Sequence, residues 1–124
     1  MFIPNEINIQ IYKGATYTQE FDVVDSVTAV PMDLTGWTAE MVIYSDPVLR
    51  TPIVTFTSGE VAIVVAKNTN GDITTSGYKV YLSPAQTEAI TESVALYDIE
   101  LTDPNEDISL AQRGIVVFEP FVIN

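Results

Sequence analysis

The stretch LYDIELTDPNEDISLAQRGIVVF, residues 96–118, sets a polar segment between two runs typical of β-strands. From Tyr97 to Leu101 every second residue is apolar, and Asp98 and Glu100 stand between them. A period of two is that of a strand with one buried face. The polar segment TDPNEDISLAQR follows, and the chain returns in the apolar run GIVVF. This order predicts a β-hairpin whose apolar positions face a core while Asp98 and Glu100 face solvent.

The connection of this hairpin also has the spacing of calcium ligands. Asp103, Asn105 and Asp107 are two residues apart, as the first three ligands of a calcium-binding loop are. The sixth position of such a loop needs glycine and is Ile108, and the twelfth needs a bidentate glutamate and is Gly114. The three residues are therefore a weak calcium candidate. The competing interpretation is a polar turn in which the intervening proline fixes one backbone angle and Asn105 adopts positive φ.

The same alternation recurs along the chain, and a helical period is rare. Strands are predicted at 7–11, 17–23, 37–43, 53–57, 61–65, 78–82, 97–101 and 115–118. Turn formers such as Asn70-Gly71 separate them. Seven to eight short strands at hairpin spacing predict an all-β fold, an immunoglobulin-like antiparallel β-sandwich. A chain of 124 residues has the size of one domain, so a single domain is predicted over 1–124.

One segment breaks the alternation. Ser83 can cap a helix, Pro84 stands at the first helical position, and Gln86 has the spacing of a capping box. One short helix is therefore predicted at about 84–91, between two strands. Immunoglobulin-like sandwiches have such a corner, with a tyrosine near the start of the next strand and a tryptophan in the core. Tyr97 and Trp37 are the candidates, and plain core positions are the alternative for both.

The composition argues against several classes of function. The chain has no cysteine and no histidine, which removes disulfides, thiolate metal sites and Ser-His-Asp triads. Its net charge of −12 argues against nucleic acid and anionic membranes as partners. Asp98 and Glu100 share one face of a strand, whereas a catalytic carboxylate pair faces across a cleft. We therefore expect a non-enzymatic protein with no catalytic residues and no cofactor.

Aromatic and apolar side chains outside the inward stripes are candidates for an interface. These interface candidates are Phe2, Ile3, Tyr12, Tyr44, Tyr81 and Phe121. Tyrosine and phenylalanine are enriched at protein interfaces. Residues 1–14 are a candidate N-terminal strand that pairs with a partner chain, because edge strands at chain ends invite such pairing. Stacking of exposed tyrosines on sugars and simple core packing are the alternatives.

Four segments in a fixed order carry a further signal. They are PMDLTGWTAEMVI (31–43), NGDITTSGYKVYLSPAQTEAI (70–90), ALYDIELT (95–102) and AQRGIVVFEPFVI (111–123). Together they resemble the N-terminal immunoglobulin-like domain of siphophage baseplate upper proteins and related stand-alone tail proteins, over roughly residues 15–124. The chain departs from that family at its final hairpin turn, where DPNEDIS lacks the usual glycine. In the last segment, Gly114 matches the glycine that opens the family's final strand.

The first of these segments also has a physical interpretation. Asp33 can accept backbone N–H bonds across a turn, and Gly36 can supply positive φ. Leu34 and Trp37 would then anchor that turn to the core. Asp33, Gly36 and Trp37 are therefore predicted to be structural residues.

The resemblance implies a bacteriophage virion structural protein, assembled in the host cytoplasm into the particle. The expected place is the tail, the baseplate or the fibre-attachment apparatus. The expected partners are other virion proteins, with a homo-oligomer or several copies per particle, and neither nucleic acid nor membrane. A head decoration protein is one alternative. A carbohydrate-binding module for host-surface glycans is another, from a different class.

Overall fold

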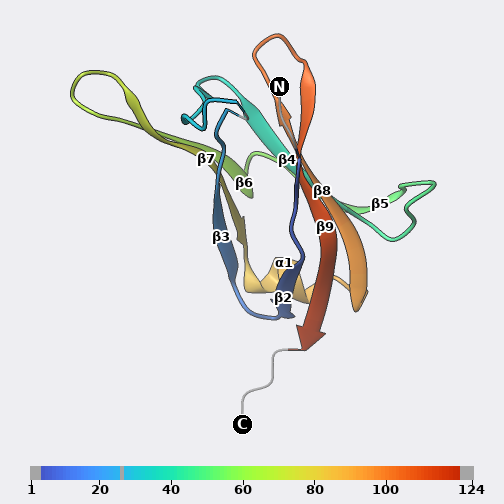
Figure 1. The fold of residues 1–124 in the computed structure, drawn as a ribbon. Helices are drawn as coiled ribbons and strands as arrows, with labels where there is room; N and C mark the ends of the chain where they lie inside the picture. Colours follow the sequence, from blue (N-terminus) through green and yellow to red (C-terminus); the bar gives the residue numbers. More distant parts are fainter. Residues whose placement is uncertain (1–3, 26, 121–124) are drawn as a thin grey trace.

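The computed structural model describes residues 4–25 and 27–120, which fold into two β-sheets packed face to face (Figure 1). The predicted all-β, immunoglobulin-like sandwich with one short helix is confirmed. In chain order the elements are β1 (Asn5–Glu6), β2 (Ile9–Lys13), β3 (Tyr17–Asp22), β4 (Thr38–Tyr44), β5 (Pro52–Phe56), β6 (Val61–Lys67), β7 (Ile73–Leu82), α1 (Pro84–Glu88), β8 (Val94–Thr102) and β9 (Ile108–Pro120).

The larger sheet, here sheet A, has the strand order β1-β9-β8-β4-β5, with β2 also paired to β9. The smaller, sheet B, has the order β3-β7-β6. Both β1 and β2 run parallel to β9, so the prediction of a purely antiparallel sandwich was wrong at this edge. The strand β9 lies inside sheet A, with β8 on one side and β1 and β2 on the other. Of the segment 1–14, the strands β1 and β2 pair with the chain's own β9.

Alternating side chains from both sheets fill the space between them. Ala39, Met41 and Ile43 project inward from β4, and β8 contributes Ala95, Tyr97, Ile99 and Leu101. Val80 and Leu82 meet them from β7 in sheet B. Burying a valine, leucine, isoleucine or methionine side chain contributes roughly 1.5–3 kcal/mol. The alternation seen in the sequence therefore accounts for the packing that stabilises the two sheets against each other.

A neutral polar cluster, which we call the inner triad, crosses this core. It consists of Tyr78, Gln112 and Tyr97. The Tyr78 hydroxyl donates to Gln112 Oε1 at 2.5 Å, and Gln112 Nε2 donates to the Tyr97 hydroxyl at 2.7 Å. The Tyr97 hydroxyl in turn donates to the backbone oxygen of Ile7 at 2.5 Å. The triad therefore links β7 of sheet B to two strands of sheet A and to the N-terminal edge.

The N-terminal edge is interrupted between β1 and β2 because of this triad. The Ile7 carbonyl points to Tyr97 instead of along the sheet, and the Asn8 side chain replaces it by accepting from the Ile115 N–H at 3.1 Å. Gly114 lies opposite, in the middle of β9, where a Cβ atom would overlap the Ile7 carbonyl. Gly114 therefore does not open the last strand as expected, and its role is to let the edge backbone approach.

Helix α1 carries the predicted capping box. The Ser83 Oγ accepts from the Gln86 N–H at 3.2 Å, and Gln86 Oε1 accepts from the Ser83 N–H at 2.8 Å. The helix ends at Glu88 rather than near residue 91, with Ala89 as its C-cap. The buried Thr87 hydroxyl accepts from Gly14 N–H and donates to the Ala15 carbonyl, which fastens the helix to the β2–β3 turn. No helix in the described ranges is long and apolar enough to cross a membrane.

The turn before β4 has the predicted geometry. Asp33 Oδ1 accepts from the Thr35 N–H at 3.0 Å and from its hydroxyl at 2.6 Å. These two hydrogen bonds, the hydroxyl first, hold the pKa of Asp33 below its ordinary value. Gly36 has a φ of +83°. Leu34 is fully buried, and Trp37 is half-buried against the core just before β4.

Tyr97 does not play the corner role expected of an immunoglobulin-like tyrosine. Such a tyrosine bonds backbone a few residues upstream, whereas the Tyr97 hydroxyl reaches Ile7, 90 positions away. The residue is a member of the core that ties β8 to the N-terminal edge.

Candidate functional site

The acidic turn between β8 and β9 is closed by hydrogen bonds to the side-chain carboxylate of Asp103. Asp103 Oδ1 accepts from the N–H groups of Asn105 and Asp107 at 2.8 and 2.9 Å. The positive φ of 71° in this turn belongs to Glu106 and not to Asn105. The described residues contain no group of three or more histidine, cysteine, aspartate or glutamate side chains that could hold a metal ion. In the structure these two hydrogen bonds make Asp103 the residue that closes the hairpin turn, as in the polar-turn interpretation.

The interface candidates do not gather in one place. Tyr12 and Tyr81 are 47% and 50% exposed. Tyr12 lies on the outer face of sheet A, beside the inward Ile11, and Tyr81 lies on the outer face of sheet B, between the inward Val80 and Leu82. The structure therefore does not bring these two rings together as a stacking platform. Phe2, Ile3 and Phe121 lie outside the described residues.

Tyr44 belongs to a packed cluster, which we call the outer triad, with Arg50 and Asp98. Its hydroxyl donates to Asp98 Oδ1 at 3.1 Å, and the Arg50 guanidinium lies 5.0 Å above the Tyr44 ring. The guanidinium also forms an ion pair with Asp98 Oδ2. Tyr44 is only 8% exposed, so its interpretation as an exposed interface residue was wrong. Asp98 points away from the core as predicted but is 1% exposed, because Arg50 and Tyr44 cover it.

The conformation of the β4–β5 loop places Arg50 against Asp98 and over the Tyr44 ring. Asp46 Oδ1 accepts from the N–H groups of Val48 and Leu49 at 2.7 and 3.2 Å. The Arg50 N–H then donates to the Asp46 carbonyl at 2.8 Å, and Arg50 itself has a φ of 53°. A non-glycine residue with positive φ is uncommon and indicates that the surroundings fix its conformation. The loop therefore folds back over the outer face of sheet A.

Next to the outer triad, four apolar side chains form a continuous surface, here the outer patch. They are Val94, Leu96, Ile115 and Val117. Val94 pairs with Val117 and Leu96 with Ile115, and all four stand on the side of sheet A that faces away from the core. Val94 is 59% and Ile115 42% exposed. An apolar surface on both faces of a strand pair is unusual for a sheet that faces water on one side.

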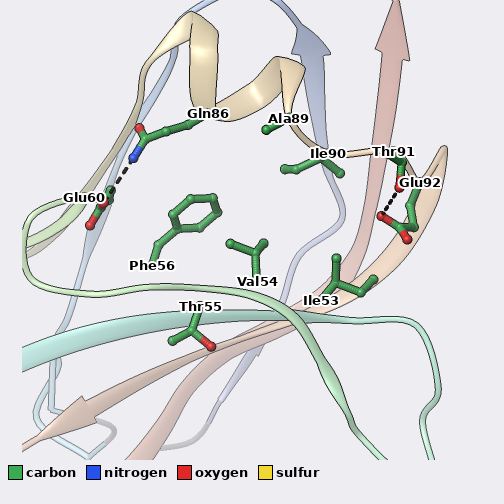
Figure 2. A pocket seen from close by; sticks show the side chains of 10 residues that line it. All are labelled: Ile53, Val54, Thr55, Phe56, Glu60, Gln86, Ala89, Ile90, Thr91 and Glu92. Atoms are coloured by element: carbon green, nitrogen blue, oxygen red, sulfur yellow. Dashed lines mark hydrogen bonds between the residues drawn. The ribbon is translucent and has the colours of Figure 1, made fainter.

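A groove of about 470 Å³ lies between β5 and the α1 segment, beside the free edge of β5 (Figure 2). Here it is called the β5 groove. It is lined by Ile53, Val54, Thr55, Phe56, Glu60, Gln86, Ala89, Ile90, Thr91 and Glu92. Figure 2 shows Phe56 and Val54 projecting from β5 toward α1, with Glu60 at one end of the groove and Glu92 at the other. Gln86 Nε2 donates to Glu60 Oε1 at 3.0 Å, and the Thr91 hydroxyl donates to Glu92 Oε1 at 3.2 Å.

Neither the outer patch nor the β5 groove was identified from the sequence. The run IVVF at 115–118 does carry a signal for the patch. Its apolar residues are consecutive and do not alternate with polar ones, which is typical of strands covered on both faces. The groove has no comparable signal, because β5, the start of β6 and the segment after α1 meet only in the folded chain. Its two carboxylates, Glu60 and Glu92, are 32 positions apart.

Comparison with known proteins gives no family. No family model matches the sequence, and no curated protein matches it. Among solved structures the chain is similar to the sialic acid binding region of a Streptococcus sanguinis SK1 adhesin, with 11% sequence identity and a TM-score of 0.41. The similarity covers 95% of this chain and 29% of the adhesin chain, so this chain spans less than a third of that protein's length.

Proposed function

We propose that this chain is a non-enzymatic structural protein of a bacteriophage particle that acts by docking onto other virion proteins in several copies. Its place is the tail, the baseplate or the fibre-attachment apparatus, as the resemblance of the four ordered sequence segments implies. The outer patch is the single structural observation that carries the docking function.

The physical argument concerns where the apolar surface lies. A chain with a net charge of −12 is kept soluble and apart from its copies by repulsion. Exposed valine and isoleucine gathered on one sheet face work against that solubility, whereas docking to another protein would remove them from water. Each partly exposed aliphatic side chain that becomes buried contributes on the order of 1 kcal/mol.

The test places charge in the outer patch and follows the protein into particles. In the phage that encodes the chain, Val94→Glu combined with Ile115→Glu is expected to lower the amount of the protein in purified particles by about tenfold or more, because two charges would have to be buried on docking. The matched control is Ile108→Glu, which changes an apolar residue that is 65% exposed at the start of β9 and outside the patch. Quantitative mass spectrometry of the particles gives the readout.

Incorporation of the double variant at the level of the Ile108→Glu control would refute docking through this patch. Absence of the unaltered chain from purified particles would refute the virion role altogether. A density map of the particle then distinguishes a tail or baseplate position from head decoration, since both use the same kind of docking surface.

A further inference from the structure

We propose that the β5 groove is a second docking site, which takes an extended segment of another protein as an added strand of sheet A. The segment would carry apolar side chains facing the groove and a basic side chain near each end. This site is separate from the outer patch and goes beyond the proposed function, since it does not depend on where the chain sits in a particle.

The free edge of β5 is the first step of the argument. This strand pairs with β4 on one side only and ends the strand order of sheet A. Four consecutive residues, 53–56, line the groove. Val54 and Phe56 project from β5 toward α1, so the groove lies beside this strand on the side of its free edge (Figure 2). An edge of unpaired N–H and C=O groups beside a groove is the arrangement that binds a peptide by strand addition.

The groove has an apolar floor that the sandwich leaves partly uncovered. Phe56 and Ile90 are buried beneath it, and Ile53 and Val54 are half-buried. A strand added at β5 would place every second side chain over this floor. Two aliphatic side chains of an added strand would therefore pack there, while the backbone hydrogen bonds would set their register.

The charges of the groove indicate the chemistry of the partner. Glu60 and Glu92 are both half-buried, and neither has an ion pair with a lysine or arginine among the described residues. Their hydrogen-bond donors, Gln86 and Thr91, are neutral. Two carboxylates at opposite ends of an apolar groove, in a chain with a net charge of −12, favour a segment with a cation at each end.

A second copy of this chain cannot supply that segment. Its five basic residues are Lys13, Arg50, Lys67, Lys79 and Arg113. The closest two in sequence, Lys67 and Lys79, are 12 positions apart, more than twice the length of the five-residue β5. These 124 residues therefore contain no such segment, and we take the partner to be a segment of a different protein.

The test uses the full chain, labelled with ¹⁵N, and three synthetic heptapeptides. The first, KTVTVTK, places both lysines and both valines on one face of a strand. ETVTVTE reverses the charge, and TKVTVKT has the composition of the first but turns the lysines to the opposite face. The first peptide is expected to bind saturably, to shift the amide resonances of residues 53–56 and to slow their hydrogen exchange. The other two are expected to bind about tenfold more weakly or less.

A pair of double variants separates the site from the overall charge. Glu60→Gln with Glu92→Gln is expected to weaken binding of KTVTVTK about tenfold and to abolish its preference over ETVTVTE. The side-chain amide introduced at position 60 would retain an oxygen that accepts from Gln86, and circular dichroism checks the fold. Glu20→Gln with Glu106→Gln removes the same charge from exposed positions outside the groove and is expected to change binding less than about twofold.

Three outcomes would overturn the proposal. They are the absence of saturable binding of KTVTVTK, equal binding of KTVTVTK and ETVTVTE, and resonance shifts centred on the outer patch instead of β5. None of them bears on incorporation into particles, so this site and the proposed function fail or survive separately.

Discussion

Two polar clusters meet at neighbouring residues of β8, one on each face of sheet A: the inner triad is neutral, and the outer triad contains an ion pair. The inner triad extends from Tyr97 toward sheet B, and the outer triad extends from Asp98 toward the β4–β5 loop. Every member of the inner triad is 2% exposed or less, whereas the Arg50 side chain of the outer triad is 51% exposed. Water can therefore replace a lost partner in the outer triad but not in the inner one. A polar group without a substitute partner is the costlier one to disturb.

The largest effect is expected when the middle of the inner triad is replaced. Gln112→Leu keeps much of the volume but removes the acceptor of the Tyr78 hydroxyl and the donor to Tyr97. The Tyr78 hydroxyl is left without a partner, which costs about 1–3 kcal/mol, and Tyr97 loses one hydrogen bond of about 1 kcal/mol but keeps its bond to Ile7, so we expect the free energy of unfolding to fall by about 3 kcal/mol. Urea denaturation followed by circular dichroism measures it.

The double variant Gln112→Leu with Tyr78→Phe serves as the control for this prediction. It removes both the acceptor and the hydroxyl that needs it, so about 1 kcal/mol or more of the lost stability should return. A double variant less stable than Gln112→Leu alone would mean that volume, not hydrogen bonding, governs the inner triad.

A smaller effect is expected at the outer triad. Arg50→Met keeps the aliphatic stem over the Tyr44 ring but removes the partner of Asp98. Loss of a partner for a buried carboxylate is costly, but a half-exposed arginine leaves a path for water to hydrate it. We expect the free energy of unfolding to fall by about 1 kcal/mol, measured in the same urea titration.

Arg113→Met is the matched control, because the pair of Arg113 with Glu6 has both side chains exposed, at 51% and 71%. Its effect should stay below about 0.5 kcal/mol. If Arg50→Met cost as much as Gln112→Leu, access to water would not be what distinguishes the two faces.

The sequence predicts the fold better than it predicts either cluster. Alternation identifies the strands and the inward face of β8, since burial follows the period of two. The capping residues Ser83, Pro84 and Gln86 locate the start of α1, because their signal is local. The parallel pairing of β1 and β2 with β9 was missed, since it joins residues more than 100 positions apart.

The candidate sites were missed for the same reason. Asp98 has the sequence environment of an exposed acid and becomes buried because a loop 48 positions away brings Arg50 over it. Tyr44 follows an inward residue of β4 and therefore points outward, as predicted, but the same arginine covers its ring. Loops decide which outward-pointing residues remain exposed. The loop that covers Asp98 depends on a positive φ at Arg50, and no glycine at that position signals this conformation in the sequence.

The last effect is expected only at alkaline pH and again separates the two faces. Burial raises the pKa of Tyr97 and Tyr78 above the ordinary value of about 10, and burial followed by the proximity of Tyr97 raises the pKa of Tyr17 to about 12. Above pH 10 the unfolded chain therefore releases protons that the folded chain keeps. The three tyrosines should leave the free energy of unfolding unchanged below about pH 9 and lower it as the pH rises through 10 toward 12. Urea titrations at each pH should give a shallower fall for Tyr78→Phe and an unchanged one for the exposed Tyr12→Phe. An equal change of slope in both variants would mean that ionisation inside the sandwich is not what weakens the fold.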